Sequence, residues 1–333
     1  MSADIRLSFL GMFGKSVITE TASAQTSRRD VNVVLALDRS GSMGGVCETM
    51  KSDAENFVSK FVNGRDTIGL ITFMSFAEVD QASTKNFKPV VTNTLANLAC
   101  GGNTASAAAL YLAHQEILKA NESSATNVIL FFTDGMPNGF TAGPAADKMP
   151  AGFPLKTGKS CKDGSSVGAG YIADGGGIFS VPPVGQQGIG STASPVLTTC
   201  PSGGFFQLSQ DYSFIPEVDA YGNSATATGY ASVSRNADGT IAFSQANSDA
   251  ISINAADDAA RQIRKDNIVI YTIGLDGDGD VDSKLLEKIA NDPAYPATYV
   301  ASQPAGKYYY SPNAGQLGAA FDSIASEILR ISR

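Results

Sequence analysis

Short apolar runs with little polar alternation recur along the chain, separated by segments whose apolar residues follow helical spacing. A continuous apolar run of this kind is typical of a strand buried on both faces. Such runs lie at 31–37, 67–73, 127–132 and 268–273, and helical spacing marks 46–62, 105–119, 255–265, 283–290 and 314–331. Buried strands that alternate with helices predict an α/β fold with a doubly wound, mostly parallel sheet.

Two stretches break this pattern and predict additional parts. Residues 138–250 show no sustained period and contain more than half of the 34 glycines, so we expect an inserted subdomain of turns and short strands. Near the N-terminus Ile5, Leu7 and Phe9 alternate with polar residues, which favours two short strands around 11–14. The predicted organisation is an N-terminal β segment at 1–30, a core in two parts at 31–137 and 251–333, and an insertion at 138–250.

The amino-acid composition limits the classes of ligand and partner that this chain can bind. The 333 residues include 32 acidic and 24 basic ones, a net charge of −8, which excludes a broad basic surface for nucleic acid and favours cations. With one histidine, a His-rich zinc site is also excluded. No apolar run reaches about 18 residues, and the first residues lack the basic and apolar regions of a signal peptide, so we expect neither a membrane span nor a leader.

The four cysteines stand at 47, 100, 161 and 200, without the spacing of a metal site or of a thiol enzyme. An even number at wide spacing fits two disulfides in an oxidising compartment. The alternative is four reduced structural thiols in a cytosolic protein.

Oxygen-bearing side chains gather where the predicted strands end. They are Asp38, Ser40 and Ser42 after the first apolar run, Thr104 before a predicted helix, and Asp134 after the run at 127–132. In an open α/β sheet ligands bind beyond the carboxyl ends of the strands, so we expect these residues to meet, the first three on one side of an extended loop. Oxygen donors without sulfur or imidazole suit Mg²⁺, Mn²⁺ or Ca²⁺. The alternative is that they are ordinary caps and turn residues.

The motifs that carry these residues are DRSGS, GGNT and TDG, in that order. They resemble the metal-ion-dependent adhesion site (MIDAS) of von Willebrand factor A domains, and the resemblance spans both parts of the core. It implies that Ser40 and Ser42 bind the metal directly, Thr104 directly or through water, and Asp38 and Asp134 mainly through water. It also implies an open metal position that accepts a carboxylate from a partner protein.

A narrower resemblance rests on NVVLALDRSGSM, on the positions of Cys47 and Cys100, and on the ending KYYYSPNAGQLGAAFDSIASEILRIS. These features are similar to those of bacterial TadG-like proteins, which are associated with tight-adherence (Tad) pili outside the cytoplasm. Such proteins commonly begin with a membrane-anchoring helix, and no such helix precedes DIRLSFLGMFG, so we expect either an excised or processed form or a chain without the anchor. Order along the chain favours the pairs Cys47–Cys100 and Cys161–Cys200. Cys47 follows one loop of the expected metal site and Cys100 precedes another, so the first bridge would tie these loops together, and the second would crosslink the insertion.

A second acidic cluster has the spacing of a calcium loop. Its members are Asp276, Asp278, Asp280, Asp282 and Glu287, similar to an EF-hand but without the glycine of the turn. The alternative is a solvated loop between strand and helix, with Asp282 as the N-cap of the helix.

Together these features predict a metal-dependent adhesion or protein-binding module, extracytoplasmic and associated with Tad-type pili. We expect no enzymatic activity, because no acid/base pair is visible beyond the metal aspartates. The alternative function is a structural subunit that self-assembles into an extracellular filament, with the N-terminal strands added to a neighbour's sheet edge.

Overall fold

The computed structural model describes residues 2–6, 17–21, 28–122, 124–142, 155–157, 177–180, 195–198, 210–212, 214–215, 217–242, 245–277 and 281–332. The central sheet consists of β3 (Val31–Asp38), β4 (Thr67–Phe73), β5 (Ala77–Thr84), β6 (Thr126–Thr133), β14 (Val269–Leu275) and β15 (Lys307–Ser311). Their order is β15-β14-β6-β3-β4-β5, and all neighbours are parallel except β5, which runs antiparallel to β4. The predicted α/β fold with a mostly parallel sheet is confirmed.

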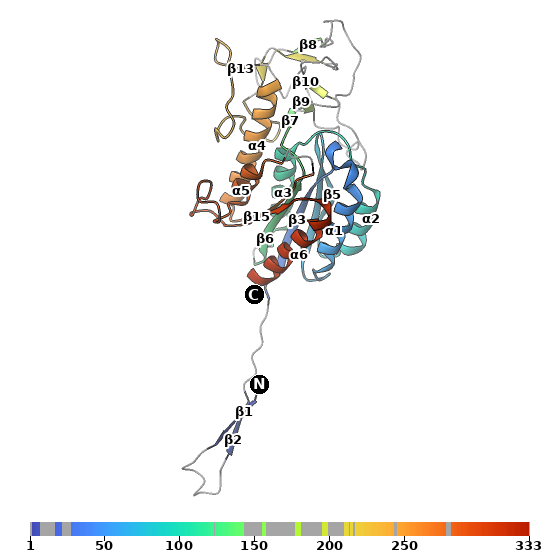
Figure 1. Cartoon of the computed structure of the whole chain (residues 1–333), viewed down its shortest axis with the longest axis vertical. Coiled ribbons are helices and arrows are strands. Elements are labelled where there is room, and N and C mark those ends of the chain that lie inside the picture. The colour runs from blue at the N-terminus through green and yellow to red at the C-terminus, as the bar shows by residue number, and fades with distance from the viewer. Residues whose placement is uncertain are drawn as a thin grey trace.

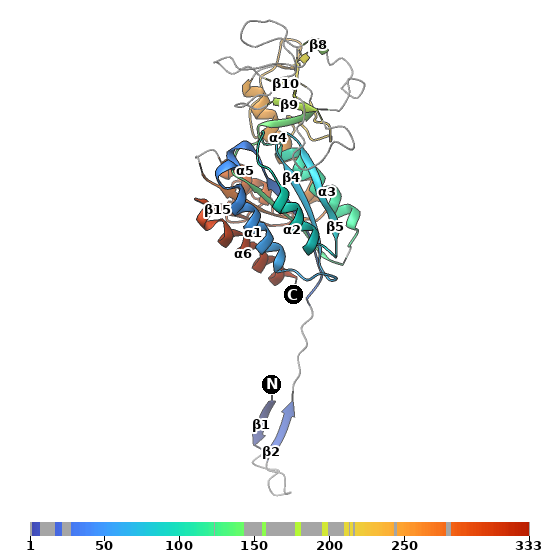
Figure 2. The same cartoon turned by 90° about the vertical axis from the view of Figure 1, so that its right-hand side faces the viewer.

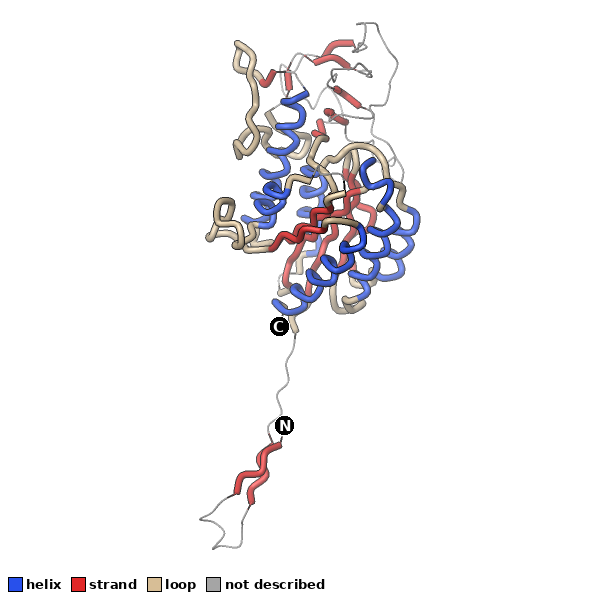
Figure 3. Tube along the Cα trace, in the orientation of Figure 1, coloured by secondary structure: helices blue, strands red, loops and turns tan. Residues whose placement is uncertain are grey.

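Within the described residues, three helices cover each face of this sheet (Figures 1 and 3). On one face lie α3 (Ser106–Ala120), α4 (Gln245–Lys265) and α5 (Ser283–Ala290), and on the other α1 (Cys47–Ser59), α2 (Lys88–Asn97) and α6 (Ala314–Ile331). Val34 and Ala36 of β3 join the first core, whereas Val33 and Leu35 join the second. Burial on both faces explains why the strands are continuous apolar runs in the sequence.

Several elements differ from the sequence-based expectation. No element was expected at β5 or α2, and α4 begins at Gln245 rather than at 255. β5 is an edge strand whose pairing with β4 is interrupted by two register shifts, and α2 begins without a side-chain cap. β5 therefore lacks a regular strand period, and α2 has Pro89 near its start but no capping side chain.

The N-terminal strands and the inserted strands lie beyond opposite ends of the α/β core (Figures 1 and 2). β1 (Ser2–Arg6) and β2 (Val17–Thr21) pair as an antiparallel hairpin, apart from the central sheet. The described strands of the insertion are β7 (Gly139–Ala142), β8 (Leu155–Thr157), β9 (Gly177–Ser180), β10 (Pro195–Thr198), β11 (Gln210–Tyr212), β12 (Phe214–Ile215) and β13 (Ile241–Ala242). The domain boundaries at 30, 137 and 250 stay a prediction. None of the described helices combines the length and apolar character needed to cross a bilayer.

Candidate metal centre

The candidate site begins at the carboxyl end of β3, where the side chain of Asp38 is fully buried. Asp38 Oδ1 accepts the backbone N–H of Ser40 at 2.7 Å, and Asp38 Oδ2 accepts the hydroxyl of Thr133 at 2.5 Å. Thr133 is the last residue of β6, the strand that lies beside β3. Two neighbouring strand ends therefore hold this carboxylate in one orientation.

Two serine hydroxyls connect this position with Asp134. Ser40 Oγ lies 3.0 Å from Ser42 Oγ, and Ser42 Oγ donates to Asp134 Oδ1 at 2.8 Å. The segment is not the extended loop that the alternate spacing predicts, because Gly41–Gly45 forms a 3₁₀ helix, η2. The turn begins after Ser40, whose backbone is extended with ψ of 176°, so the two hydroxyls still meet.

Backbone hydrogen bonds attach the loop at 101–104 to the serine loop. The N–H of Gly41 donates to the carbonyl of Gly102 at 2.9 Å, and the N–H of Gly101 donates to the carbonyl of Arg39 at 2.7 Å. Gly102 has φ of +93°, a conformation that favours glycine. These bonds bring Thr104, the fifth predicted residue, to the site, whereas the other four are linked by direct hydrogen bonds.

The charges at this site bear on what it could hold. Burial and, next, the charge of Asp134 raise the pKa of Asp38 to about 7, although hydrogen bonds from Thr133 and Ser40 lower it. Two neighbouring carboxylates repel each other in the protein alone, and a bound cation relieves that repulsion. Because every donor is an oxygen, the residues fit a hard divalent cation. Their assignment as metal ligands stays a prediction.

Arg39 and Thr133 support the site but have no role in the sequence-based prediction. The Arg39 side chain is 1% exposed and donates to Thr72 Oγ1 at 2.9 Å and to Glu78 Oε1 at 3.2 Å. It thereby ties the serine loop to β4 and β5, while Thr133 orients Asp38. The only signal in the sequence was that both residues lie within the quoted motifs, DRSGS and TDG.

A disulfide joins Cys47 to Cys100, as predicted, with a Cα–Cα distance of 6.2 Å. Cys47 begins α1 just after η2, and Cys100 directly precedes the loop at 101–104. The bridge therefore crosslinks the two loops that carry Ser42 and Thr104. Cys161 and Cys200 lie outside the described residues, so the second disulfide stays a prediction.

The described members of the predicted calcium loop make other contacts. Asp276 Oδ2 accepts the hydroxyl of Tyr310 at 2.6 Å, and Asp282 Oδ1 accepts the N–H of Leu285 at 3.0 Å as the N-cap of α5. The N-cap alternative for Asp282 is thus confirmed. Glu287 lies within α5, whereas Asp278 and Asp280 lie outside the described residues. In the described part of the chain, no three His, Cys, Asp or Glu side chains cluster as a metal site, and the calcium site stays a prediction.

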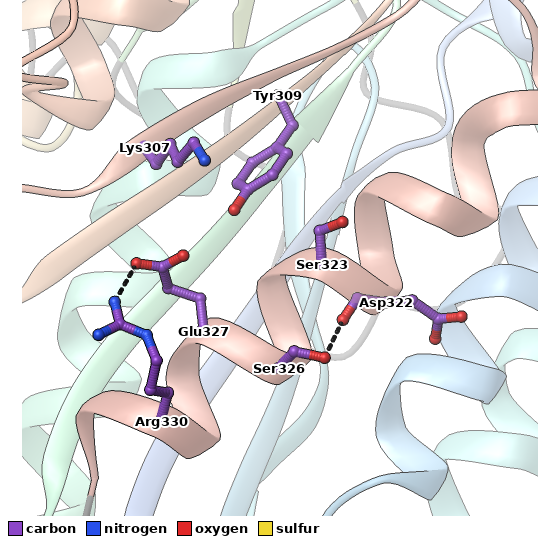
Figure 4. A pocket seen from close by; sticks show the side chains of 7 residues that line it. All are labelled: Lys307, Tyr309, Asp322, Ser323, Ser326, Glu327 and Arg330. Atoms are coloured by element: carbon purple, nitrogen blue, oxygen red, sulfur yellow. Dashed lines mark hydrogen bonds and ion pairs between the residues drawn. The ribbon is translucent and has the colours of Figure 1, made fainter.

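A shallow hollow of about 450 Å³ lies between β15 and the second half of α6 (Figure 4). Glu327 accepts from Arg330 at 2.8 Å, and Lys307 Nζ lies 4.8 Å from the centre of the Tyr309 ring. Its lining carries charges of both signs and contains none of the predicted metal ligands.

The sheet order, the helices on both faces and the loops at the carboxyl ends of β3 and β6 define a von Willebrand factor type A fold. Residues 33–136 match the family model of the von Willebrand factor type A domain. No curated protein sequence matches the chain.

Several solved structures with the same fold are domains of pilus proteins. The von Willebrand factor domain of the type V pili tip protein Mfa5 from Porphyromonas gingivalis is 17% identical, with a TM-score of 0.55 over 92% of this chain and 98% of that one. The PilB minor pilin from Streptococcus sanguinis is 15% identical, with a TM-score of 0.53 over 96% and 66%. The pilus adhesin SpaC from Lactobacillus rhamnosus GG is 14% identical, with a TM-score of 0.50 over 94% and 31%. This chain thus spans about a third of SpaC.

Proposed function

We propose that this chain is a binding module, not an enzyme, that attaches to a partner protein through a divalent cation. The cation, Mg²⁺ or alternatively Mn²⁺ or Ca²⁺, is held by Asp38, Ser40, Ser42, Thr104 and Asp134. It supplies an electrophilic centre for an acidic side chain of the partner. The observation that carries this proposal is the set of hydrogen bonds at the end of the sheet where ligands bind: Asp38 accepts the backbone N–H of Ser40, and the Ser40 hydroxyl contacts that of Ser42, which donates to Asp134.

The proposed setting is adhesion outside the cytoplasm, in association with a Tad-type pilus. Three of the similar folds come from a pilus tip protein, a minor pilin and a pilus adhesin, which supports this setting at the level of fold. The resemblance of the sequence to TadG-like proteins supports the Tad association. The disulfide supports an oxidising compartment.

The test is a thermal melt of chelator-treated protein with increasing MgCl₂. Saturation at a hundred times Kd raises the melting temperature by roughly 5 °C, because the cation binds the folded state alone. Asp38→Asn removes this shift, and its melting temperature without metal equals or exceeds that of the wild type, since repulsion with Asp134 is relieved. Glu55→Ala, an exposed change on α1, is the control and keeps the full shift. A wild-type melt unaffected by Mg²⁺, Mn²⁺ and Ca²⁺ rejects the proposal.

A partner is sought by pull-down from the native cell surface with and without chelator. The expected partner is retained in Mg²⁺, is released by chelator and is not retained by Asp38→Asn. Retention that chelator does not affect shows that binding does not run through the cation.

The second candidate is a filament subunit, and it rests on the β1–β2 hairpin that stands apart from the sheet (Figures 1 and 2). An isolated two-stranded hairpin is marginally stable, so pairing with a neighbouring chain stabilises it. Electron microscopy of purified protein tests this, with ordered fibres as the expected result.

A further inference from the structure

The peptide groups around Thr104 are held by two residues that the predicted metal set does not include. The N–H of Thr104 donates to Asn138 Oδ1 at 2.7 Å. The carbonyl of Thr104 accepts the N–H groups of Asn138 and Gly139, each at 3.1 Å. Asn138 and Gly139 therefore occupy both backbone polar groups of Thr104. Neither of them binds its hydroxyl in these hydrogen bonds, so the hydroxyl can face another ligand.

The start of β7 also packs tightly against the same loop. A Cβ atom on Gly139 would lie 3.2 Å from both the backbone N and the Cβ of Ala105, the residue after Thr104. Contacts this short displace a neighbour, so glycine permits the close approach of the two segments. On the opposite side of this loop, Ser75 Oγ accepts the N–H of Asn103 at 3.2 Å. The position of Thr104 thus depends on β7 on one side and on the β4–β5 turn on the other.

β7 is also the first strand of the inserted stretch. It pairs in parallel with β9, and the carbonyl of Thr141 accepts the N–H of Ala220 at 2.7 Å. Next to Ala220, the ring of Tyr221 stacks on Tyr111 of α3 with 4.7 Å between ring centres. The hydrogen bond therefore attaches this part of the insertion to β7, whose first residues bond to Thr104, and the ring contact attaches it to α3.

We propose that Asn138 is a positioning residue that holds Thr104 for the cation and couples the inserted strands to the metal centre. This inference rests on the proposed function. Outer residues that orient a metal ligand typically change metal affinity 10- to 100-fold when they are replaced. The coupling is reciprocal, so cation binding stabilises β7, and a partner that displaces β7 weakens cation binding.

The test compares Mg²⁺ affinity by calorimetry in the wild type, Asn138→Ala and two controls. Asn138→Ala weakens Mg²⁺ binding about tenfold or more because Thr104 loses its anchor. Asn138→Asp keeps an acceptor for the Thr104 N–H and stays within about threefold of the wild type. Asn97→Ala removes an exposed asparagine that bonds only locally, to the carbonyl of Asn93, and leaves the affinity unchanged.

Hydrogen exchange provides a readout that general loss of stability does not reproduce. In metal-free protein, Asn138→Ala speeds exchange of the Thr104 amide about fivefold, the effect of losing one ordinary hydrogen bond. In the wild type Mg²⁺ slows exchange of the β7 amides, and in Asn138→Ala it does not. If Asn138→Ala fails to fold, the same measurements are made on Gly139→Ala. The added Cβ pushes β7 away from Ala105, while the Asn138 side chain itself is unchanged.

The two proposals fail in different ways. A wild type that binds no divalent cation rejects the proposed function and this inference with it. A wild type that binds Mg²⁺, together with Asn138→Ala of equal affinity or with equal Mg²⁺ protection of β7 in both proteins, overturns the role of Asn138 alone.

Discussion

A single buried carboxylate, Asp66, organises the chain where it enters the central sheet. Its two oxygens accept the guanidinium of Arg28 at 2.9 and 2.7 Å and the backbone N–H groups of Val62 at 2.8 Å and Val31 at 3.3 Å. Burial raises the pKa of Asp66, but the hydrogen bonds from Arg28 and Val62 outweigh it, and the net shift is downward. The same segment is fixed at a second point, because the N–H of Arg29 donates to the carbonyl of Ser332, close to the C-terminal end of the sequence.

Asp66→Asn is expected to lower the free energy of unfolding by about 2–4 kcal/mol, because it leaves the Arg28 guanidinium and two amides without an anionic acceptor. The pKa of Asp66 is lower in the folded than in the unfolded state. Its contribution is therefore complete above the unfolded pKa of about 4 and is lost as the pH falls through the folded pKa. Urea unfolding of both proteins at neutral and acidic pH measures this.

The matched control is Asp30→Asn, which breaks the exposed pair between Asp30 and Arg65 and costs less than about 1 kcal/mol. A difference between Asp66→Asn and the wild type that is the same at both pH values would show that the effect does not come from the charge.

Residue by residue, the sequence predicted which side chains meet at the candidate site, but not the residues that contact them. Asp38, Ser40, Ser42 and Asp134 follow strands within short motifs, so their meeting at one sheet end was predictable. The hydrogen bond from Thr104 to Asn138 was not, because the two residues belong to segments distant in the sequence. Such pairings are set by tertiary packing and leave no local periodicity.

Among the secondary-structure elements, most of the buried ones were predictable, whereas the edge strand β5 and the helix α2 were not. β4, α5 and α6 begin and end where the sequence placed them, because their apolar patterns reflect burial in the core. β5 is an edge strand with exposed and half-buried residues over most of its length. Its irregular register is typical of edge strands that avoid pairing with another chain. The same irregularity removes the regular alternation by which a strand is recognised in the sequence.

The disulfide between Cys47 and Cys100 connects the start of α1 with the residue directly before the loop at 101–104. Replacing both residues by serine is expected to lower the free energy of unfolding by about 4 kcal/mol, because the bridge closes a loop with a sequence separation of 53. It also weakens Mg²⁺ binding, since the loops of Ser42 and Thr104 lose their crosslink. Calorimetric unfolding and Mg²⁺ titration of the variant measure both effects. Lower stability with unchanged Mg²⁺ affinity restricts the bridge to a structural role.

At the scale of the whole molecule, the candidate metal centre and the hairpin belong to opposite ends. The loops of the candidate metal centre follow β3 and β6, and the loop after β6 leads into β7 of the insertion. β1 and β2 lie beyond the other end of the sheet (Figures 1 and 2). Arg28, between the hairpin and β3, is fixed to Asp66. This arrangement separates cation binding from any assembly through the hairpin, so the two proposed functions are testable independently in one protein.

Deletion of residues 1–27 is the experiment for this separation, because it removes both hairpin strands and keeps Arg28 on Asp66. The shortened chain is expected to show the same rise in melting temperature with Mg²⁺ as the full chain, since every predicted ligand remains. If the full chain forms fibres under the electron microscope, the deletion abolishes them when strand addition is the mechanism. Fibres that persist point to another assembly surface, and a lost Mg²⁺ response contradicts the independence of the two ends.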